Sequence, residues 1–547
     1  MREQQQIQGH QIAPSWRCVA QSTRSAVLLA MALALSGCAS LGLAPAGLSP
    51  ALPLASSPTL TATGNPEVSR CSAWLLALDA AVDKAHVRDG AAHPVAGFGW
   101  LRVDRFLASF REDLLAGLEG DASSARFADW LTHLEAMDAQ GRAVELANLP
   151  DDAVPDGLAK SEAEARMQAC SALLSAAVAK SPELRQQLID RAQVPDDYQP
   201  WKRALGLYPL TRLPFFAGVQ GWQKGLQARF DASGATAASA TTSASAVTEA
   251  PGRPLDRYLP RTLVQQPGPT VDTGALLGAA PRDALGIWQL DDAQKQQLVD
   301  AYAPVLEIET QGQFDRFGRL RWGTGPAPEV LTDTPLAYRR LAWQRYGAHV
   351  LPQLVYSFWF PERPSAGGID LLAGTLDAVV LRVTLSPEGA PLMVDSIHAC
   401  GCYHLFFPVG AVTPRPAPSP SEEWAFVPAT LPALLPGQRV AVQLESGTHY
   451  LVGIRPDAGE PGQAYAMEPD DTLRTLPVGM VGGTRSAFLP SGIVPGTERV
   501  ERWLFWPMGI DSPGSTRQWG RQPTAFVGRR HFDDARLLEQ RFDLFKR

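Results

Sequence analysis

Apolar residues recur about every 3.6 positions between residues 67 and 231, which is the spacing of one helix face. Similar series run through 103–114, 126–149, 167–178 and 210–230, the last interrupted at Pro214. The spacing therefore predicts an N-terminal bundle of about five to seven helices over residues 67–231. The clearest series is Cys71, Trp74, Leu75, Leu78 and Val82.

The pattern stops at residues 232–254, which read ASGATAASATTSASAVTEAPGRP. Small residues of this kind cannot bury enough apolar area to order themselves. We therefore predict a low-complexity linker here and a domain boundary on either side of it.

Residues 255–547 are rich in β-branched and aromatic runs separated by turn sequences, which predicts strands. The turn at 386–389 predicts a hairpin between two of these strands. We predict an α+β fold: an N-terminal helical bundle followed by a β-rich, antiparallel sandwich-like C-terminal domain. Strands are expected at 305–309, 354–360, 376–385, 391–398, 440–444, 449–454, 503–507 and 524–527, and helices at 291–303 (with Asp291 as N-cap), 335–346 and 533–546.

The first 37 residues have the pattern of an export signal. Arg17 and Arg24 precede an apolar run at 26–36, shorter than the roughly 20 residues of a spanning helix. The run ends in LSGC at 35–38, which resembles the lipobox of bacterial lipoproteins. The resemblance implies that Cys38 takes a diacylglycerol, that residues 1–37 are removed, and that the new amine is acylated. The alternative is an ordinary signal peptide that happens to contain a cysteine.

The residue after the cysteine is Ala39, which by resemblance to the sorting rule of Gram-negative envelopes favours the outer membrane. Residues 38–66 carry no charge and read as a lipidated flexible tether. Several acyl chains together hold a protein stably on a bilayer. The expected location is therefore the cell envelope, anchored by lipid to the outer membrane and facing the periplasm.

Composition adds two limits. The net charge of −7 gives no indication of a nucleic-acid partner. No apolar run of about 18 residues follows the signal, so the membrane is a predicted partner only through the lipid anchor.

The chain has six cysteines, of which Cys18 leaves with the signal and Cys38 is lipidated. An even number remains in an oxidising compartment, which suggests two disulfides. Cys71 and Cys170 each lie on an apolar helix face, which favours a bond between them over two buried free thiols.

The densest chemical segment is DSIHACGCYH at residues 395–404. Its His398, Cys400, Cys402 and His404 carry the nitrogen and sulfur donors that zinc and copper prefer. Three interpretations stay open: a Cys400–Cys402 disulfide, a metal site with the two histidines, or a redox-active thiol pair. If strand ends converge, His398, His404, His449 and an acid would form an open zinc-type site that activates water.

Further candidates lie near the C-terminus. His531 precedes Asp533 and Asp534, and it follows a basic cluster of Arg517, Arg521, Arg529 and Arg530. The arginines fit either an anion clamp or an exposed, solvated face. The structural alternatives are a hydrogen-bonded strand edge for His449 and a helix N-cap for Asp533. The chain has no H-E-x-x-H, G-x-S-x-G, Walker or dinucleotide motif, which argues against the common proteases, esterases and NTPases.

A run from Val355 to His404 reads YSFWFP at 356–361, GTLDAVVLR at 374–382 and SIH at 396–398. This order is similar to the sandwich region of proteins related to vacuolar sorting protein 62 and to necrosis-inducing toxins. In those proteins an Asp-Trp-Glu segment precedes a Ser-x-His strand. Asp377 and His398 match, whereas the acidic segment is missing, so the resemblance implies a sandwich fold and does not carry over the metal site.

Two functions follow as hypotheses. The first is a lipid-anchored, non-enzymatic envelope module that binds a small molecule or a protein partner. The second is a metal-dependent hydrolase of the zinc type, with its site at His398, His404 and His449.

Overall fold

The structure, a computed structural model, describes residues 65–116, 121–232, 255–265, 271–368, 370–479 and 482–545. All of the described residues belong to one compact unit. The predicted signal, Cys38, the tether as far as residue 64 and the linker from residue 233 lie outside the described residues. Among the helices that are described, none is both long and apolar enough to cross a bilayer.

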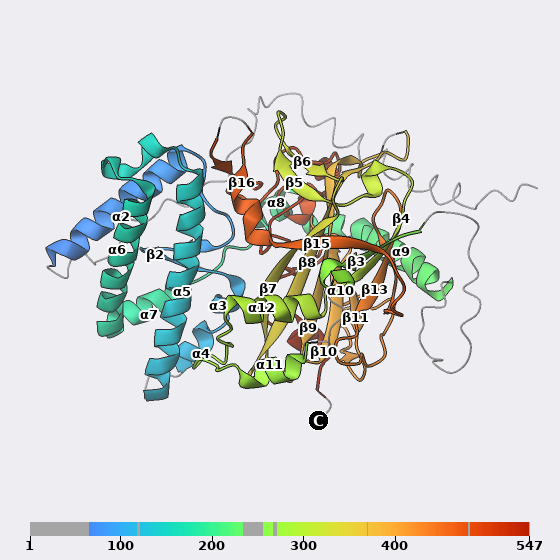
Figure 1. Ribbon diagram of the computed structural model, residues 1–547, viewed down its shortest axis with the longest axis horizontal. Coiled ribbons are helices and arrows are strands. Elements are labelled where there is room, and N and C mark those ends of the chain that lie inside the picture. Colours follow the sequence, from blue (N-terminus) through green and yellow to red (C-terminus); the bar gives the residue numbers. More distant parts are fainter. Residues whose placement is uncertain are drawn as a thin grey trace, which may run out of the picture. The chain divides into compact units, whose positions relative to one another are not determined.

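The first part of the described chain is helical, as predicted. Helices α2, α5 and α6 lie next to one another (Figure 1). Asn65 caps α2 by accepting a hydrogen bond from the backbone of Glu67, and Pro66 takes the first helical position. The helices are α2 Pro66–Lys84, α3 Arg105–Ala108, α4 Arg111–Ala116, α5 Asp121–Asn148, α6 Lys160–Lys180, α7 Pro182–Arg191, α8 Pro200–Leu205 and α9 Tyr208–Ala232, with a hairpin of β1 His93–Val95 and β2 Phe98–Val103 after α2.

The predicted Cys71–Cys170 disulfide is confirmed and joins α2 to α6, with 5.3 Å between the two Cα atoms. The helical spacing explains the pairing. Trp74, Leu78 and Val82 are buried on one face of α2, and Cys170 lies on the buried face of α6 with Leu174. Two apolar faces that pack together bring the two cysteines into contact.

The second part is a curled ten-stranded sheet with the order β11-β10-β9-β8-β7-β15-β3-β4-β13-β14. Strands β7 to β11 pair antiparallel, but β15 is parallel to both β7 and β3, and β13 is parallel to β4. The α+β class is therefore confirmed, whereas the sheet is mixed and not the antiparallel one predicted. Its strands are β3 Leu255–Pro260, β4 Val305–Glu309, β7 Leu336–Tyr346, β8 His349–Arg363, β9 Gly374–Leu385, β10 Pro391–His398, β11 Leu405–Pro408, β13 Val440–Leu444, β14 Leu451–Pro456 and β15 Gln463–Pro469.

The curl brings distant strands face to face. His449, just before the edge strand β14, lies 2.9 Å from Asp377 on β9, near the opposite edge. Helix α12 packs on β7 and β8, and α9 packs on β14 with Leu226 and Phe230 buried. The smaller elements are α10 Arg261–Gln265, α11 Thr273–Ala279, α12 Asp292–Ala301, β5 Arg319–Trp322, β6 Pro328–Leu331, β12 Thr413–Pro414, β16 Leu476–Pro477, β17 Thr484–Arg485, α13 Arg502–Phe505, α14 Leu537–Arg541 and β18 Phe542–Asp543.

Several element predictions hold and others are wrong. Asp291 caps α12 as expected, and the 386–389 turn joins β9 to β10. Residues 335–346 were expected to be helical, but 336–346 form β7, because pairing with β8 and β15 on both sides overrides local preference. Residues 503–507 are helical in α13 and η6 (Trp506–Met508), residues 524–527 are not in a strand, and the expected C-terminal helix is reduced to α14.

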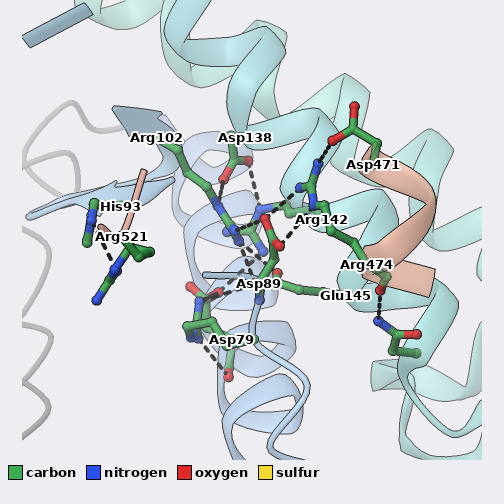
Figure 2. Close-up of polar contacts among 12 residues, drawn as sticks. Asp79, Asp89, His93, Arg102, Asp138, Arg142, Glu145, Asp471, Arg474 and Arg521 are labelled. Atoms are coloured by element: carbon green, nitrogen blue, oxygen red, sulfur yellow. Dashed lines mark hydrogen bonds and ion pairs between the residues drawn. The ribbon is translucent and has the colours of Figure 1, made fainter. Parts of the chain in front are cut away.

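Buried charges are paired where the helices meet the chain near Arg474 (Figure 2). Arg102 of β2 contacts Glu145 at 2.8 Å and Asp138 at 3.1 Å, both on α5. Arg474 of η5 (Asp470–Thr475) binds both carboxylate oxygens of Asp89, at 2.6 and 3.0 Å. This cluster therefore ties the helices to the chain that follows β15. We call it the Arg102 network: Asp79, Asp89, Arg102, Asp138, Arg142, Glu145 and Arg474.

Candidate functional site

The predicted residues His398 and His449 meet at one buried carboxylate, Asp377. His398 Nδ1 donates to Asp377 Oδ1 at 3.4 Å, and His449 Nδ1 donates to Oδ2 at 2.9 Å. Arg499 Nη2 adds a contact to Oδ1 at 3.3 Å. Burial alone raises the pKa of a carboxyl, but His398 and Arg499 outweigh it and hold the pKa of Asp377 well below its usual range. Asp377 is therefore an ionised group inside the curled sheet.

Backbone strain is concentrated around this carboxylate. Leu376, Tyr403 and His449 all have positive φ angles, of 54°, 62° and 53°. Residues other than glycine seldom adopt this region, and a bulky residue there costs conformational energy. Leu376 precedes Asp377, and Tyr403 follows the turn that leaves His398. Strain of this kind is characteristic of functional sites, where surrounding contacts hold a side chain in a required position.

His398 lines a small cavity and has one ring nitrogen without a partner. Because Nδ1 donates to Asp377, the neutral ring carries its lone pair on Nε2. Burial lowers the pKa of His398 below 6.5, against the attraction of Asp377, so the neutral ring is favoured at pH 7. Nε2 is buried and has no hydrogen-bond partner in the protein. His398 lines a cavity of about 10 Å³, which is room for about one water molecule.

Aromatic rings form the walls of this cavity, which we call the His398 cavity. Tyr403 and Tyr450 pack edge to face with His398, at centroid distances of 5.0 and 5.7 Å. Trp222 of α9 closes the cavity, with its ring 5.0 Å from Tyr403. Arg363 donates to the Tyr450 hydroxyl at 3.1 Å and fixes that ring. The arrangement places an oriented proton acceptor among flat apolar surfaces, in a space for about one water molecule.

His449 is held for structural reasons. Its Nδ1 faces Asp377, and its Nε2 faces the backbone oxygen of Phe314 at 3.1 Å. Phe360 stacks on the ring at 4.0 Å. Asp315, also buried, accepts hydrogen bonds from Ser446 and Gly447 in the same turn. Both His449 nitrogens therefore have oxygen partners, so the ring has no lone pair directed at an added ligand.

His404 does not join this site. It lies against Asp395, with 2.9 Å between His404 Nε2 and Asp395 Oδ2, and Arg382 binds the same carboxylate. Side chains alternate along a strand, so Asp395 and His398 point to opposite faces of β10. The predicted metal cluster of His398, His404, His449, Cys400 and Cys402 is thus not assembled. Across the described residues, no group of three or more His, Cys, Asp or Glu side chains is placed to hold a metal ion.

Acidification is expected to destabilise the fold through His404. Burial lowers the pKa of His404 to about 3, despite the hydrogen bond to Asp395. In the unfolded chain the ring binds a proton near pH 6.5, whereas in the folded chain it does so only near pH 3. Between these two values the free energy of unfolding therefore falls by about 1.4 kcal/mol for each unit by which the pH is lowered. His404→Gln keeps a donor for Asp395 but does not titrate. Between about pH 6 and pH 4, the slope of its free energy of unfolding against pH should be smaller than that of wild type by the uptake of one proton. An unchanged slope contradicts this assignment.

Cys400 and Cys402 are free thiols in the structure, so the disulfide, one of the three interpretations left open, is not present in it. A hydrogen bond between the two sulfurs lowers the pKa of Cys400 and raises that of Cys402. The turn that carries them is tight: Gly401 has φ 94°, and a Cβ there would collide with the Pro523 carbonyl. The pair lies beside the His398 cavity, on the turn that positions His398 and Tyr403.

Two charged residues near the thiols, Arg499 and Glu501, could not be predicted as site residues from the sequence. Arg499 binds Asp377 and the backbone oxygens of Leu372 and Leu376. Burial raises the pKa of Glu501 to about 7, against the attraction of Arg499. Neither residue belongs to a motif, and both lie more than 90 positions after Cys400 or Asp377. Trp222 was predicted only as part of a helix.

The C-terminal candidates are placed elsewhere and are engaged in the fold. His531 lies among Asp196, Asp197 and Asp534. Asp533 pairs with Arg105 and does not cap a helix. Neither alternative for the arginines describes the whole cluster: Arg517 and Arg530 are buried, and each arginine contacts groups of the protein. The contacts are Arg517 with the Asp511 and Ser512 carbonyls, Arg521 with Asp197, Arg529 with Asp196, and Arg530 with Thr524 and Trp424.

Comparison with known proteins adds no assignment: no family model matches the chain, and neither a curated protein nor a solved structure is similar to it.

Proposed function

We propose that this chain is a lipid-anchored protein of the cell envelope that binds a small ligand in the His398 cavity. The lipid is on Cys38, and the folded part faces the periplasm from the outer membrane. The observation that carries the binding role is the buried, unpartnered Nε2 of His398 in an aromatic-walled cavity. A buried polar atom without a partner is costly, and a ligand that donates a hydrogen removes that cost.

Two observations support the envelope location. The LSGC sequence at 35–38 ends a short apolar run, as a lipoprotein signal does. The Cys71–Cys170 disulfide fits an oxidising compartment, where such bonds persist.

The chemistry of the cavity limits the ligand. His398 Nε2 accepts a hydrogen bond, so the ligand carries a hydroxyl or an N–H group there. Trp222, Tyr403 and Tyr450 favour a flat or ring-shaped body that stacks on their faces. The cavity now has room for about one water molecule, so a larger ligand enters only when the Trp222 ring moves outward.

Native mass spectrometry of the chain, extracted from envelopes in mild detergent, tests both parts of the proposal. We expect the mass of a chain that begins at Cys38 with acyl groups, plus the mass of a bound small molecule. His398→Phe keeps an aromatic ring but removes the acceptor, so it should lower ligand occupancy at least tenfold. His404→Gln is the matched control, since His404 is equally buried but faces away from the cavity.

The two parts fail separately. A chain without acyl groups contradicts the anchor and leaves the cavity assignment standing. Equal occupancy in wild type and His398→Phe, or no bound molecule in either, contradicts the binding role.

A further inference from the structure

Exposed apolar side chains gather on α8 and the first half of α9. Of the twelve large apolar residues that are exposed within the described ranges, seven lie on these two helices, between them, or in or just before the adjoining α13. Their exposed fractions are 56% to 71%. Isolated exposed apolar residues are ordinary, but a contiguous group marks an interaction surface. We call this group the α8–α9 patch: Trp201, Leu205, Leu207, Leu210, Leu213, Val500 and Trp503.

The two segments of the patch form one surface because they pack on each other. Gly206, between α8 and α9, lies so close to η6 that a Cβ there would be 2.7 Å from Pro507 Cα. Phe215 of α9 packs edge to face on Phe505 of α13, with 5.2 Å between the centroids. The segment that carries Val500 and Trp503 therefore lies next to α8 and α9.

One member of the patch is held outward by the backbone. Leu207 has φ 48°, in the left-handed region that favours glycine, yet it carries a large side chain that is 60% exposed. This conformation costs energy, and the folded chain recovers none of it by burying the side chain. An exposed leucine at a strained turn indicates that the side chain has a use outside the protein.

The charge around the α8–α9 patch favours an anionic bilayer over a protein as its partner. The chain as a whole has a net charge of −7. Residues 200–232, which contain α8 and α9, have five basic side chains (Lys202, Arg203, Arg212, Lys224, Arg229) and one acidic side chain, Asp231. Lys202 pairs with Asp511 and Arg229 with Glu445, so the surface keeps a smaller positive excess. Leucine and tryptophan beside lysine and arginine on a helix is the pattern of a surface that enters the interface of an anionic bilayer.

We propose that the α8–α9 patch inserts into the surface of an anionic phospholipid bilayer. The apolar side chains enter the headgroup region, while Arg212 and Lys224 contact lipid phosphates. Tryptophan suits this position because its ring is apolar and its N–H is polar. The docking does not depend on the lipid at Cys38: it provides a second attachment and turns a defined face of the protein toward the membrane.

Co-sedimentation with vesicles tests the proposal. The chain is started at Ala39, which keeps the whole compact unit and removes the predicted signal and lipid site. We expect it to bind vesicles of phosphatidylethanolamine and phosphatidylglycerol, and to bind neutral phosphatidylcholine more weakly. Leu205→Ser with Leu210→Ser should lower the partition coefficient on the anionic vesicles at least tenfold. Leu76→Ser with Leu435→Ser, two leucines exposed elsewhere, is the matched control and should change it less than twofold.

Four outcomes overturn the proposal. The first is no vesicle binding by the chain from Ala39, and the second is an equal loss in both double variants. The third is a dimer in solution that the Leu205→Ser/Leu210→Ser change abolishes, because a second copy would then cover the patch. Binding gained only when the chain is started at Ser56 also overturns it, since residues 39–55 would then be the occupant. The presence or absence of lipid on Cys38 affects none of these measurements.

Discussion

Replacing Arg102 by alanine is expected to lower the free energy of unfolding by about 3 to 5 kcal/mol. The guanidinium is buried and faces Glu145, Asp138 and Asp89 (Figure 2). Burial lowers the pKa of an arginine, but Glu145 and Asp138 outweigh it and raise the pKa of Arg102, so the group stays charged. Without it, Glu145, which has almost no contact with water, loses its closest counter-charge, and buried unpaired charge is among the costliest changes a fold can undergo.

Denaturant unfolding of wild type, Arg102→Ala and Arg88→Ala measures this effect. Arg88 belongs to the same region and contacts Asp79 and Asp83, but its side chain is 17% exposed. Water screens it better, so Arg88→Ala should cost much less than Arg102→Ala. Glu145→Ala combined with Arg102→Ala should cost less than the sum of the two single changes, because the double variant removes one of the unpaired charges. Additive losses would contradict the account by unpaired charge and favour lost packing.

The helices of this fold could be predicted from the sequence more completely than its strands. On α2, Trp74, Leu78 and Val82 show the period directly and are buried as predicted. Residues 335–346 contain leucine, alanine and arginine, which also suit a helix, yet they lie between two other strands as β7. Residues 336–346 form a strand because their backbone pairs with strands far along the chain, and a local sequence pattern does not show which segments will pair.

The candidate site shows the same limit. His398 and His449 were predicted because they end or begin strands, and the sheet does bring both to one carboxylate. Asp377 was named only through the resemblance of residues 355–404 to a sandwich family, and Trp222 was predicted only as part of a helix. Contacts between α9, β9, β10 and β14 depend on how far the sheet curls, which a strand pattern does not state. His404 was grouped with His398 by proximity in sequence, whereas the turn at Gly401 sends it to the other face of β10.

Removing the Cys71–Cys170 disulfide, by changing both cysteines to alanine, is expected to lower the free energy of unfolding by about 4 to 5 kcal/mol. The bond closes a loop with a sequence separation of 99 residues. When the bond is removed, a loop of this length gives the unfolded chain much more conformational freedom. The loss of stability therefore comes mainly from the higher entropy of the unfolded state. The dependence of stability on denaturant should also steepen, because the unfolded chain then exposes more surface.

Chemical reduction provides an independent measurement of the same bond. Cys400 and Cys402 are already thiols in the structure, so a reductant should change only the Cys71–Cys170 link. Wild type in reductant and the double alanine variant should therefore unfold at nearly the same denaturant concentration, and reductant should leave the variant unchanged. A further loss of stability when the variant is reduced would mean that Cys400 and Cys402 are bonded in the isolated protein. The turn that carries His398 and Tyr403 would then be held by a covalent link, and the thiol pair beside the His398 cavity would exist only under reducing conditions.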